Sequence, residues 1–437
     1  MNLILGFGET GASFVRFLET RGLPYLIMDS RLNPPGLSHF ETLSEKDHFL
    51  GGFNKNVLND IKRVLVSPGI DFNNEVLVRA RKLGIQISTD IEIFIEQTNT
   101  RKILITGTNG KSTVVSMAGH LLQNIYGEDK VVCSGNIGKP VLDTISLGNS
   151  ISIIELSSFN IEHSKLLSSD ISVLLNIDQD HLDRHLSLEK YSQIKKAILK
   201  KTKRGLIGPG SFKSQLLKEE NNYDIEALLK PFEKDLSSLI NQDWPFHELI
   251  NIKAAIAIYI AMEDLNGKLN LNNIKKIDES LIKESIYHFN SFKRMKHRYE
   301  IIGIRDGVTF INDSKSTNIS SLEVALNSAQ RQHGKKKVLL ICGGDSKGQD
   351  FSKISEKTLE SIKHLFVFGK DKQIIMNELK NRTECSLTKD LEEALNLAWS
   401  KSLKGEAILL SPACASTDMF SNYKQRGEEF RSLSGFN

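Results

Sequence analysis

Short apolar runs that end at glycine or polar residues recur along this chain and alternate with longer stretches of helical pattern. Leu3–Leu5, Lys102–Thr106, Ile151–Leu156 and Lys337–Cys342 have the length of buried strands. Continuous apolar runs are typical of parallel strands whose two faces are both covered by crossover helices. The sequence therefore predicts an α/β protein with mostly parallel sheets.

The chain is too long for one hydrophobic core, since its 437 residues exceed the size at which single cores stop growing. Polar segments near residues 98 and 298 separate three groups of apolar runs. We expect three domains, formed by residues 1–97, 98–298 and 299–437. Within the second, residues 201–245 have weak periodicity, and their sequence predicts no particular element.

The charge and cysteine patterns exclude several classes of protein. The 57 basic and 53 acidic residues are interspersed, which argues against a nucleic-acid partner. No window approaches the roughly 18 apolar residues that a membrane span needs, and the first residues lack a basic segment and a cleavage site, so we expect neither membrane insertion nor a signal peptide. Four scattered cysteines without a CxxC pair fit a reducing compartment. We expect a cytoplasmic protein, and a monomer.

A glycine-rich loop follows the run Lys102–Thr106 and precedes an expected helix. Residues 105–113 read ITGTNGKST, in which the glycines allow backbone N–H groups to approach phosphate oxygens and Lys111 adds a mobile charge. Only two residues separate Gly107 from Gly110, so this is a shortened variant of the P-loop. A plain glycine turn with a solvated lysine is the disfavoured alternative. We predict an ATP site made of Gly107, Thr108, Asn109, Gly110, Lys111, Ser112 and Thr113.

Acidic and polar residues lie where two further strands end. Glu155 closes one buried run, and the segment NIDQDHLDR at 176–184 follows another. Carboxylates at strand ends can hold magnesium beside a phosphate loop, and the alternative is a surface loop rich in Asp and His. Tyr191 and Lys195 share one face of an expected helix. Their spacing alone favours a solvated face.

The N-terminal segment GFGETG, at residues 6–11, matches the G-x-G-x-x-G fingerprint of dinucleotide-binding domains, with Asp29 at the end of the next strand. This pattern by itself predicts NAD binding. Two features weaken that prediction: a dehydrogenase would not require the ATP loop, and Asp29 is followed by Ser30 and Arg31. No candidate site for hydride transfer stands out.

In the third part of the chain, Asp313 and Lys315 follow the expected strand Val308–Asn312. Asp313 could bind a ribose or a metal ion, and Lys315 could neutralise a transferred phosphoryl group. An Asx turn that caps a helix is the alternative.

Together these motifs resemble the Mur ligase family. TGTNGKST is similar to the ATP loop that Mur ligases share with folylpolyglutamate synthases, and the D-H-x-D-R segment followed by Y-x-x-x-K is similar to a Mur ligase segment. SPGI at 67–70, GNIG at 135–138 and NDSKSTN at 312–318 resemble segments of the members that add D-glutamate. The resemblance implies Rossmann-like first and third domains around a central P-loop-type ATPase domain. It also implies an ATP-dependent ligase of peptidoglycan precursor synthesis, which adds D-glutamate to UDP-N-acetylmuramoyl-L-alanine through an acyl phosphate.

The resemblance further implies roles for individual residues. Two Mg²⁺ ions are expected, one held by Ser112 and Glu155 and the other by His181 and a carbamate on Lys195. Lys111, His181, Lys195 and Lys315 would be the catalytic residues. Asn251, Arg298 and Asp313 would complete the ATP site. The UDP substrate would contact Glu9, Thr10, Ser30, Arg31, Asn136, Ser157 and Asn160. D-Glutamate would contact Thr317, Lys347, Ser416, Thr417 and Tyr423.

The chain departs from the family pattern on the adenine side. Glu248 stands where the family has an amide, and residues 294–298 read RMKHR, which keeps Arg298 but lacks the usual glycine and proline. Two rival classes are a folylpolyglutamate-type ligase, which should not need the GFGETG segment, and a nucleotide-binding sensor without catalysis.

Overall fold

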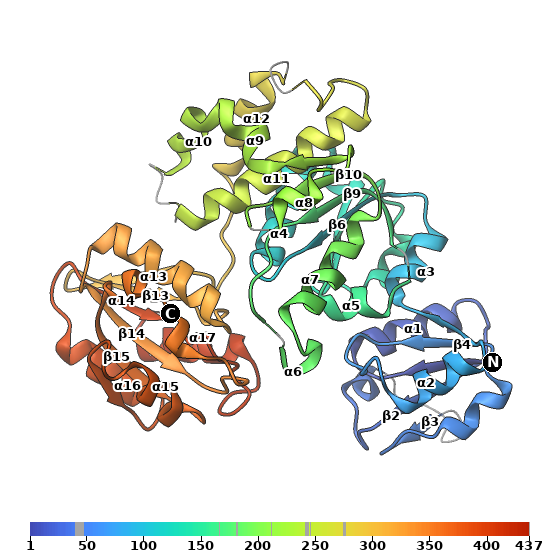
Figure 1. The fold of residues 1–437 in the computed structure, drawn as a ribbon, viewed down its shortest axis with the longest axis horizontal. Coiled ribbons are helices and arrows are strands. Elements are labelled where there is room, and N and C mark those ends of the chain that lie inside the picture. The colour runs from blue at the N-terminus through green and yellow to red at the C-terminus, as the bar shows by residue number, and fades with distance from the viewer. Residues whose placement is uncertain are drawn as a thin grey trace. The chain divides into compact units, whose positions relative to one another are not determined.

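The computed structural model describes residues 1–39, 48–165, 167–180, 182–210, 212–240, 244, 246–273 and 277–436. The chain forms two compact units, one of residues 1–177, 189–236 and 251–291 and the other of residues 178–188, 237–250 and 292–437. The first unit contains two sheets and the second contains a third (Figure 1). The predicted class, α/β with three sheet-based domains, is confirmed.

The N-terminal sheet is parallel throughout, and its order β3-β2-β1-β4-β5 is that of a Rossmann half. Alternate strand residues face opposite ways: Ile4 packs with α1 and α3, whereas Leu3 and Leu5 pack with α2. Its elements are β1 (Asn2–Leu5), α1 (Glu9–Glu19), β2 (Tyr25–Asp29), β3 (His48–Leu50), β4 (Arg63–Val66), α2 (Glu75–Lys82), β5 (Gln86–Ser88) and α3 (Asp90–Gln97).

The second sheet has six parallel strands in the order β11-β10-β9-β6-β8-β7. Residues 201–245, for which the sequence predicted no element, supply two of its strands. The strands are β6 (Arg101–Thr106), β7 (Val131–Gly135), β8 (Ile151–Glu155), β9 (Ser168–Leu174), β10 (Lys201–Ile207) and β11 (Asn222–Asp224). Because β6 lies between β8 and β9, the loops that follow these three strands meet at one edge of the sheet.

The helices between residues 111 and 289 differ widely in length. They are α4 (Lys111–Tyr126), α5 (Ser158–His163), α6 (Leu182–His185), α7 (Leu188–Lys196), α8 (Lys213–Leu216), α9 (Ile225–Leu229), α10 (Glu233–Ile240), α11 (Phe246–Leu265) and α12 (Glu279–Phe289). In the part of the chain that the structure describes, no helix has both the length and the hydropathy to cross a membrane.

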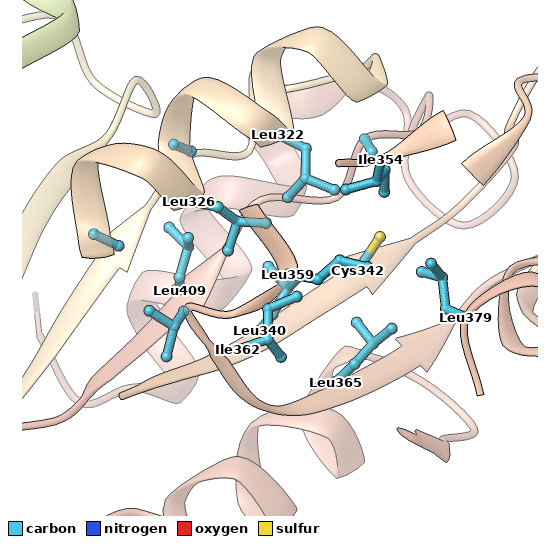
Figure 2. Packing of buried hydrophobic residues seen from close by; sticks show 14 of the residues in the cluster. Leu322, Leu326, Leu340, Cys342, Ile354, Leu359, Ile362, Leu365, Leu379 and Leu409 are labelled. Carbon is cyan, nitrogen blue, oxygen red and sulfur yellow. The ribbon is translucent and has the colours of Figure 1, made fainter. Parts of the chain in front are cut away.

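The third sheet is parallel apart from one edge, where β12 runs antiparallel to β13. One face packs on α13, as Figure 2 shows for Leu322 and Leu326 beside Leu340 and Leu409. The other packs on α16 and α17. In the order β12-β13-β17-β14-β15-β16, the strands are Glu300–Arg305, Val308–Asn312, Ala407–Leu410, Val338–Gly343, Ile362–Phe368 and Cys385–Leu387. The helices are α13 (Ile319–His333), α14 (Glu356–Leu359), α15 (Lys372–Leu379), α16 (Leu391–Lys401) and α17 (Tyr423–Leu433).

Candidate active site

The glycine-rich loop joins β6 to α4, as the sequence predicted. Gly110 has φ +82° and is the N-cap of α4, where a glycine offers no side chain to the first N–H groups of this helix. A Cβ at Gly110 would come 2.6 Å from Oδ1 of Asn251, and one at Gly107 would come 2.9 Å from Cβ of Leu175. The loop is therefore closely packed, and the uncapped start of a long helix suits an anion such as a phosphate.

The side chain of Asn176 holds the loop in shape. Its Oδ1 accepts hydrogen bonds from the backbone N–H groups of Thr108 (3.0 Å) and Asn109 (2.8 Å), and its Nδ2 donates to the Asn109 carbonyl (3.1 Å). The sequence indicated Asn176 only as part of a polar segment. Its place just after β9, which pairs with β6, is the signal that could have assigned it to the loop.

Lys111 begins α4 and turns back over the loop. Its Nζ donates to the carbonyl oxygens of Gly107 (2.9 Å) and Thr108 (2.8 Å). Ser112 is half-buried and Thr113 is buried. The ammonium group thus lies at the loop itself, where a phosphate oxygen can compete for it.

Lys195 lies behind the same loop and does not form a solvated face. Its side chain is 1% exposed, and its Nζ donates to Gly107 O (2.8 Å) and to Thr106 Oγ1 (3.3 Å). The ring centroid of Tyr191, one turn earlier on α7, lies 4.7 Å from this Nζ, and the Tyr191 hydroxyl is 3.2 Å from Thr108 Oγ1. The prediction of a solvated helix face, which the spacing favoured, is therefore wrong, because the fold packs this face of α7 against the loop.

Glu155 ends β8, in register with Ile105 of β6. Its Oε1 accepts a hydrogen bond from Nδ2 of Asn136 (3.2 Å), whereas its Oε2 is buried and has no hydrogen-bond partner among the described residues. A buried carboxylate oxygen without a donor suits a hard cation such as Mg²⁺. The described residues include no group of three or more His, Cys, Asp and Glu side chains placed for a metal. Any Mg²⁺ here would therefore need hydroxyl, phosphate or water oxygens as well, and His181 lies outside the described residues.

The N-terminal fingerprint is organised by Asp29. Its carboxylate accepts hydrogen bonds from the Phe7 N–H (2.7 Å) and from the backbone and guanidinium of Arg31 (2.7 to 2.9 Å). Burial raises the pKa of Asp29, but these hydrogen bonds outweigh it and hold the pKa below its usual value. Both oxygens are thus engaged within the protein, which counts against the ribose-binding role that an NAD site would give Asp29.

The other residues predicted for the UDP substrate occupy two places. Glu9 starts α1 and pairs with His39 (3.0 Å), with Thr10 half-buried beside it, and Ser30 is exposed. Ser157 and Asn160 form a capping box at the start of α5. Asn136 is exposed, and its backbone N–H donates to the Glu155 carbonyl (3.1 Å).

The predicted amino-acid site gathers at the carboxyl edge of the third sheet. Nζ of Lys315 lies 4.2 Å from the ring centroid of Tyr423. Ser416 is buried, whereas Thr417 and Lys347 are exposed, and Lys347 has φ +51°.

Gln349, which the sequence did not single out, joins three loops of this edge. Its Nε2 donates to the carbonyls of Ser346 (2.9 Å), Ala413 (3.0 Å) and Thr317 (3.4 Å), and its Oε1 accepts from Ile319 N–H (2.9 Å). One side chain therefore fixes the loops that follow β13, β14 and β17.

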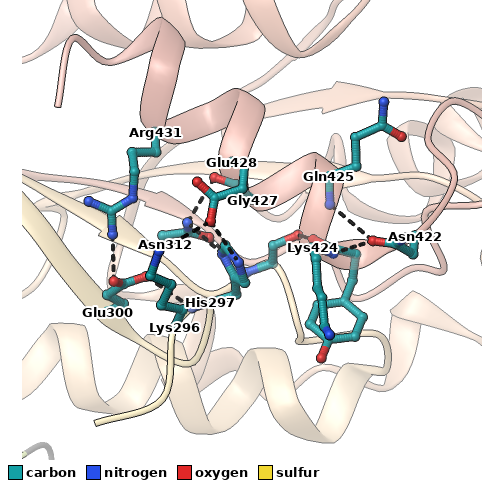
Figure 3. Close-up of polar contacts among 12 residues, drawn as sticks. Lys296, His297, Glu300, Asn312, Asn422, Lys424, Gln425, Gly427, Glu428 and Arg431 are labelled. Carbon is teal, nitrogen blue, oxygen red and sulfur yellow. Dashed lines mark hydrogen bonds and ion pairs between the residues drawn. The ribbon is translucent and has the colours of Figure 1, made fainter. Parts of the chain in front are cut away.

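The start of α17 is fixed to the end of β13 (Figure 3). Nδ2 of Asn312 donates to the Gly427 carbonyl (2.9 Å) and lies 3.1 Å from Nδ1 of His297. Glu428 reaches His297 from the same helix (3.3 Å), and Asn422 caps the helix by accepting from the N–H groups of residues 424 and 425. This anchoring gives Tyr423 a defined position above the sheet edge.

Asp313 lies in a buried group of charges with Glu248. Its oxygens accept from Tyr299 N–H (3.0 Å) and Ser411 Oγ (2.9 Å), and burial raises its pKa to about 7. Burial likewise raises the pKa of Glu248 to about 7, although Arg294 and Arg298 oppose the rise. The predicted ATP residues Arg298 and Asp313 are thus brought together, with both Asp313 oxygens already bonded within the protein.

Comparison with known proteins finds Mur ligase domains along the chain. Residues 1–89 match the family model described as Mur ligase MurD-like, N-terminal domain, residues 105–274 match the Mur ligase middle domain, and residues 297–414 match the Mur ligase, glutamate ligase domain. Proteins named UDP-N-acetylmuramoylalanine–D-glutamate ligase from Marinobacter nauticus and Buchnera aphidicola are 32% and 34% identical, and each alignment covers 99% of this chain and 97% of the relative.

Solved structures share the fold at low identity. The UDP-N-acetylmuramate–alanine ligase MurC of Thermotoga maritima superposes with a TM-score of 0.57 at 14% identity, over 99% of both chains. The MurF ligase of the same organism, determined in complex with ADP, gives 0.55 at 15% identity, over 99% of this chain and 93% of that one. With its phosphate loop, its strand-end carboxylate and these matches along its length, the chain belongs to the Mur ligase family of enzymes.

Proposed function

We propose that this enzyme is an ATP-dependent ligase that joins D-glutamate to UDP-N-acetylmuramoyl-L-alanine in peptidoglycan precursor synthesis. The observation that carries the reaction type is the phosphate loop, with the buried Lys195 behind it. On the adjacent strand, Glu155 has an oxygen without a hydrogen-bond partner in the described part of the chain. The choice of substrates is supported by the names of relatives that are 32% to 34% identical over 99% of the chain.

The first step transfers the γ-phosphoryl group of ATP to the carboxylate of UDP-N-acetylmuramoyl-L-alanine. A carboxylate oxygen forms the new P–O bond, the bond to the β-phosphate oxygen breaks, and ADP leaves with that electron pair. The N–H groups around Gly110 and the ammonium of Lys111 stabilise the phosphate charge, and Lys315 supplies a further positive charge. Asn176 contributes by holding the N–H groups of Thr108 and Asn109 in place.

The second step forms the amide. The neutral amine of D-glutamate attacks the acyl carbon, the C–O bond to phosphate breaks, and inorganic phosphate leaves while the nitrogen loses a proton. The amino acid would be oriented by Thr317, Lys347, Ser416, Thr417 and Tyr423. Alignment of the amine with the acyl carbon is expected to provide much of the rate.

The buried oxygen of Glu155 that lacks a partner among the described residues fits Mg²⁺, and Glu155 and Ser112 would hold one ion. His181 and a carbamylated Lys195 are proposed as the ligands of a second ion. When bound, Mg²⁺ supplies charge neutralisation on the transferred phosphoryl group. A carbamate would convert the Lys195 amine into an anionic oxygen ligand suited to this cation. The remaining ATP contacts are proposed for Asn251, Arg298 and Asp313.

The UDP group is proposed to bind the N-terminal turn through Glu9, Thr10, Ser30 and Arg31, with Asn136, Ser157 and Asn160 contacting the rest of the substrate. Asp29 supports this choice over NAD because Arg31 and Phe7 already occupy its oxygens. We place the enzyme in the cytoplasm as a monomer, and its four free cysteines fit a reducing compartment.

The substrate assignment is tested by incubating the enzyme with ATP, Mg²⁺, UDP-N-acetylmuramoyl-L-alanine and one amino acid at a time. We expect equal amounts of ADP, phosphate and amide product with D-glutamate only. Turnover with L-glutamate or L-alanine in its place would overturn the assignment. Turnover of a folate substrate would favour a folylpolyglutamate-type ligase, and binding without phosphate release would favour a sensor.

The carbamate is tested by Lys195→Ala. We expect this variant to be inactive and to regain part of its activity when a short-chain carboxylate is added, because the carboxylate can replace the missing oxygen ligand. Lys200→Ala, at an exposed lysine just beyond the same helix, is the matched control and should need no supplement. Full activity of unsupplemented Lys195→Ala would exclude the carbamate.

A further inference from the structure

Arg426 is completely buried and lies on α17, three residues after Tyr423 of the predicted amino-acid site. Its Nε donates to Ser314 Oγ (3.1 Å), and its Nη2 donates to the carbonyls of Ser314 (2.8 Å) and Cys414 (3.1 Å). Ser314 directly precedes Lys315, and Cys414 lies two residues before Ser416. The guanidinium therefore contacts the backbone of two of the loops that carry predicted contacts to D-glutamate, those that follow β13 and β17.

The positive charge of Arg426 has no ionic partner within the described part of the protein. Its Nη1 is buried without any hydrogen-bond partner there. Asp313 and Asp418 act on Arg426 only through their charge, which raises its pKa. Asp313 accepts hydrogen bonds from Tyr299 N–H and Ser411 Oγ, and Oδ2 of Asp418 accepts one from Lys370 N–H (2.9 Å). Burial lowers the pKa of Arg426 to about 10, which leaves the group charged at neutral pH.

A buried cation without an ion-pair partner is costly, because it has lost its water and gains only the longer-range attraction of Asp313 and Asp418. The cost falls when an anion binds nearby, since charges interact more strongly at a site shielded from water. Three residues before Arg426 on the same helix, Tyr423 is predicted to contact the amino acid, so the charge lies close to where an acidic ligand would be bound.

We propose that Arg426 determines the preference for an acidic amino acid, because its buried charge, which forms no ion pair among the described residues, favours the side-chain carboxylate of D-glutamate over a neutral side chain. This inference rests on the proposed function and deepens it. Arg426 acts through the field at the site and through the backbone of the two loops.

The experiment compares kcat/KM for D-glutamate with that for D-glutamine, which has the same shape but an uncharged side chain. In Arg426→Met, the D-glutamate to D-glutamine ratio should fall at least about tenfold. In Arg426→Lys, which keeps the charge but loses the planar fork, the ratio should stay within about threefold even if kcat falls. Ser314→Ala removes the hydroxyl contact and leaves the charge, and it should keep the wild-type ratio.

The outcomes separate the two proposals. No turnover of D-glutamate by the wild type would refute the proposed function itself. A wild type that uses D-glutamate, together with a folded Arg426→Met variant that keeps the ratio, would refute the role of Arg426 alone. Thermal unfolding checks the fold of each variant. If Arg426→Met does not fold, Asp418→Asn decides, because loss of a nearby negative charge should raise the ratio about twofold or more, and an unchanged or lower ratio would overturn the inference.

Discussion

Glu248 offers a direct test of the buried charges in the second unit. Its side chain is 4% exposed, and its Oε2 has no hydrogen-bond partner among the described residues. Burial is the main cause that raises its pKa to about 7, with the negative charge of Asp313 acting in the same direction. We predict that Glu248→Gln stabilises this unit at alkaline pH and flattens the dependence of its stability on pH.

The size and sign of this effect on the unfolding free energy follow from the two protonation states of Glu248. The rise from the ordinary value of 4.5 to about 7 corresponds to about 3 kcal/mol of unfolding free energy at most. Below the ordinary pKa, both the folded and the unfolded carboxyl are protonated and the penalty is absent. Between the two pKa values only the unfolded carboxyl ionises, so stability falls as the pH rises. Above about pH 7 the penalty is complete and no longer changes.

Tryptophan fluorescence reports on the unit in question, because the chain has two tryptophans and both, Trp244 and Trp399, belong to it. Urea unfolding followed at pH 5 and pH 8 should show the wild type losing about 2 kcal/mol or more over this interval. Glu248→Gln should lose clearly less and be the more stable protein at pH 8. Asp313, whose pKa is also raised to about 7, leaves a residual slope in both proteins.

Glu392→Gln is the matched control, since Glu392 is exposed on α16 of the same unit and the change should leave the profile unaltered. Parallel pH profiles for the wild type and Glu248→Gln would refute the reasoning. Such a result would mean that Arg294 and Arg298 compensate the carboxylate in solution.

Three further changes probe the candidate site. Asn176→Ala should raise the Kd for ATP, measured by calorimetry, about tenfold or more. Two backbone N–H groups of the loop would lose their acceptor, at a cost of roughly 1 kcal/mol each. Unchanged affinity would show that the loop keeps its shape without the Asn176 side chain. Gly110→Ala should abolish measurable ATP binding, because Gly110 has φ +82° and the new Cβ would meet the Asn251 side chain. The control Gly52→Ala, at a glycine with open space around it, should bind ATP normally. Gln349→Glu should raise the KM for D-glutamate about tenfold and leave the KM for ATP unchanged. In the variant, carboxylate oxygens would face the carbonyl groups that accept hydrogen bonds from the Gln349 amide in the wild type. The control Gln373→Glu, at an exposed residue, should change neither constant.

The sequence was most informative where structure is determined locally. The loop at residues 107–113 is flanked by an apolar run and a helical pattern, and it forms the β6–α4 connection that this order predicts. Carboxylates and amides at strand ends, such as Glu155 and Asn176, come together because parallel strands place those ends at one edge. The N-terminal fingerprint was likewise found in its expected setting, and the structure added that Asp29 bonds to the turn itself.

Residues whose importance depends on tertiary packing were not predictable in the same way. The spacing of Tyr191 and Lys195 is the same whether their helix face is solvated or buried, and only the placement of α7 behind the phosphate loop decides between the two. Gln349 and Arg426 act mainly on backbone carbonyls of distant loops. Nearly any loop can accept such bonds, so the accepting residues carry no sequence signal of their own.

Glu248 shows how a departure from a family pattern gains meaning from structure. In the sequence it was only an acid in place of an amide. In the structure it is a buried carboxylate within reach of the charges of Arg294, Arg298 and Asp313, and its pKa lies near neutrality. An amide at this place would hold no proton that pH could remove, whereas the carboxyl group ties the stability of its surroundings to pH. The acid at this position therefore affects stability whatever its effect on ATP binding. Glu248→Gln separates these two effects, because fluorescence reports stability and calorimetry reports ATP binding.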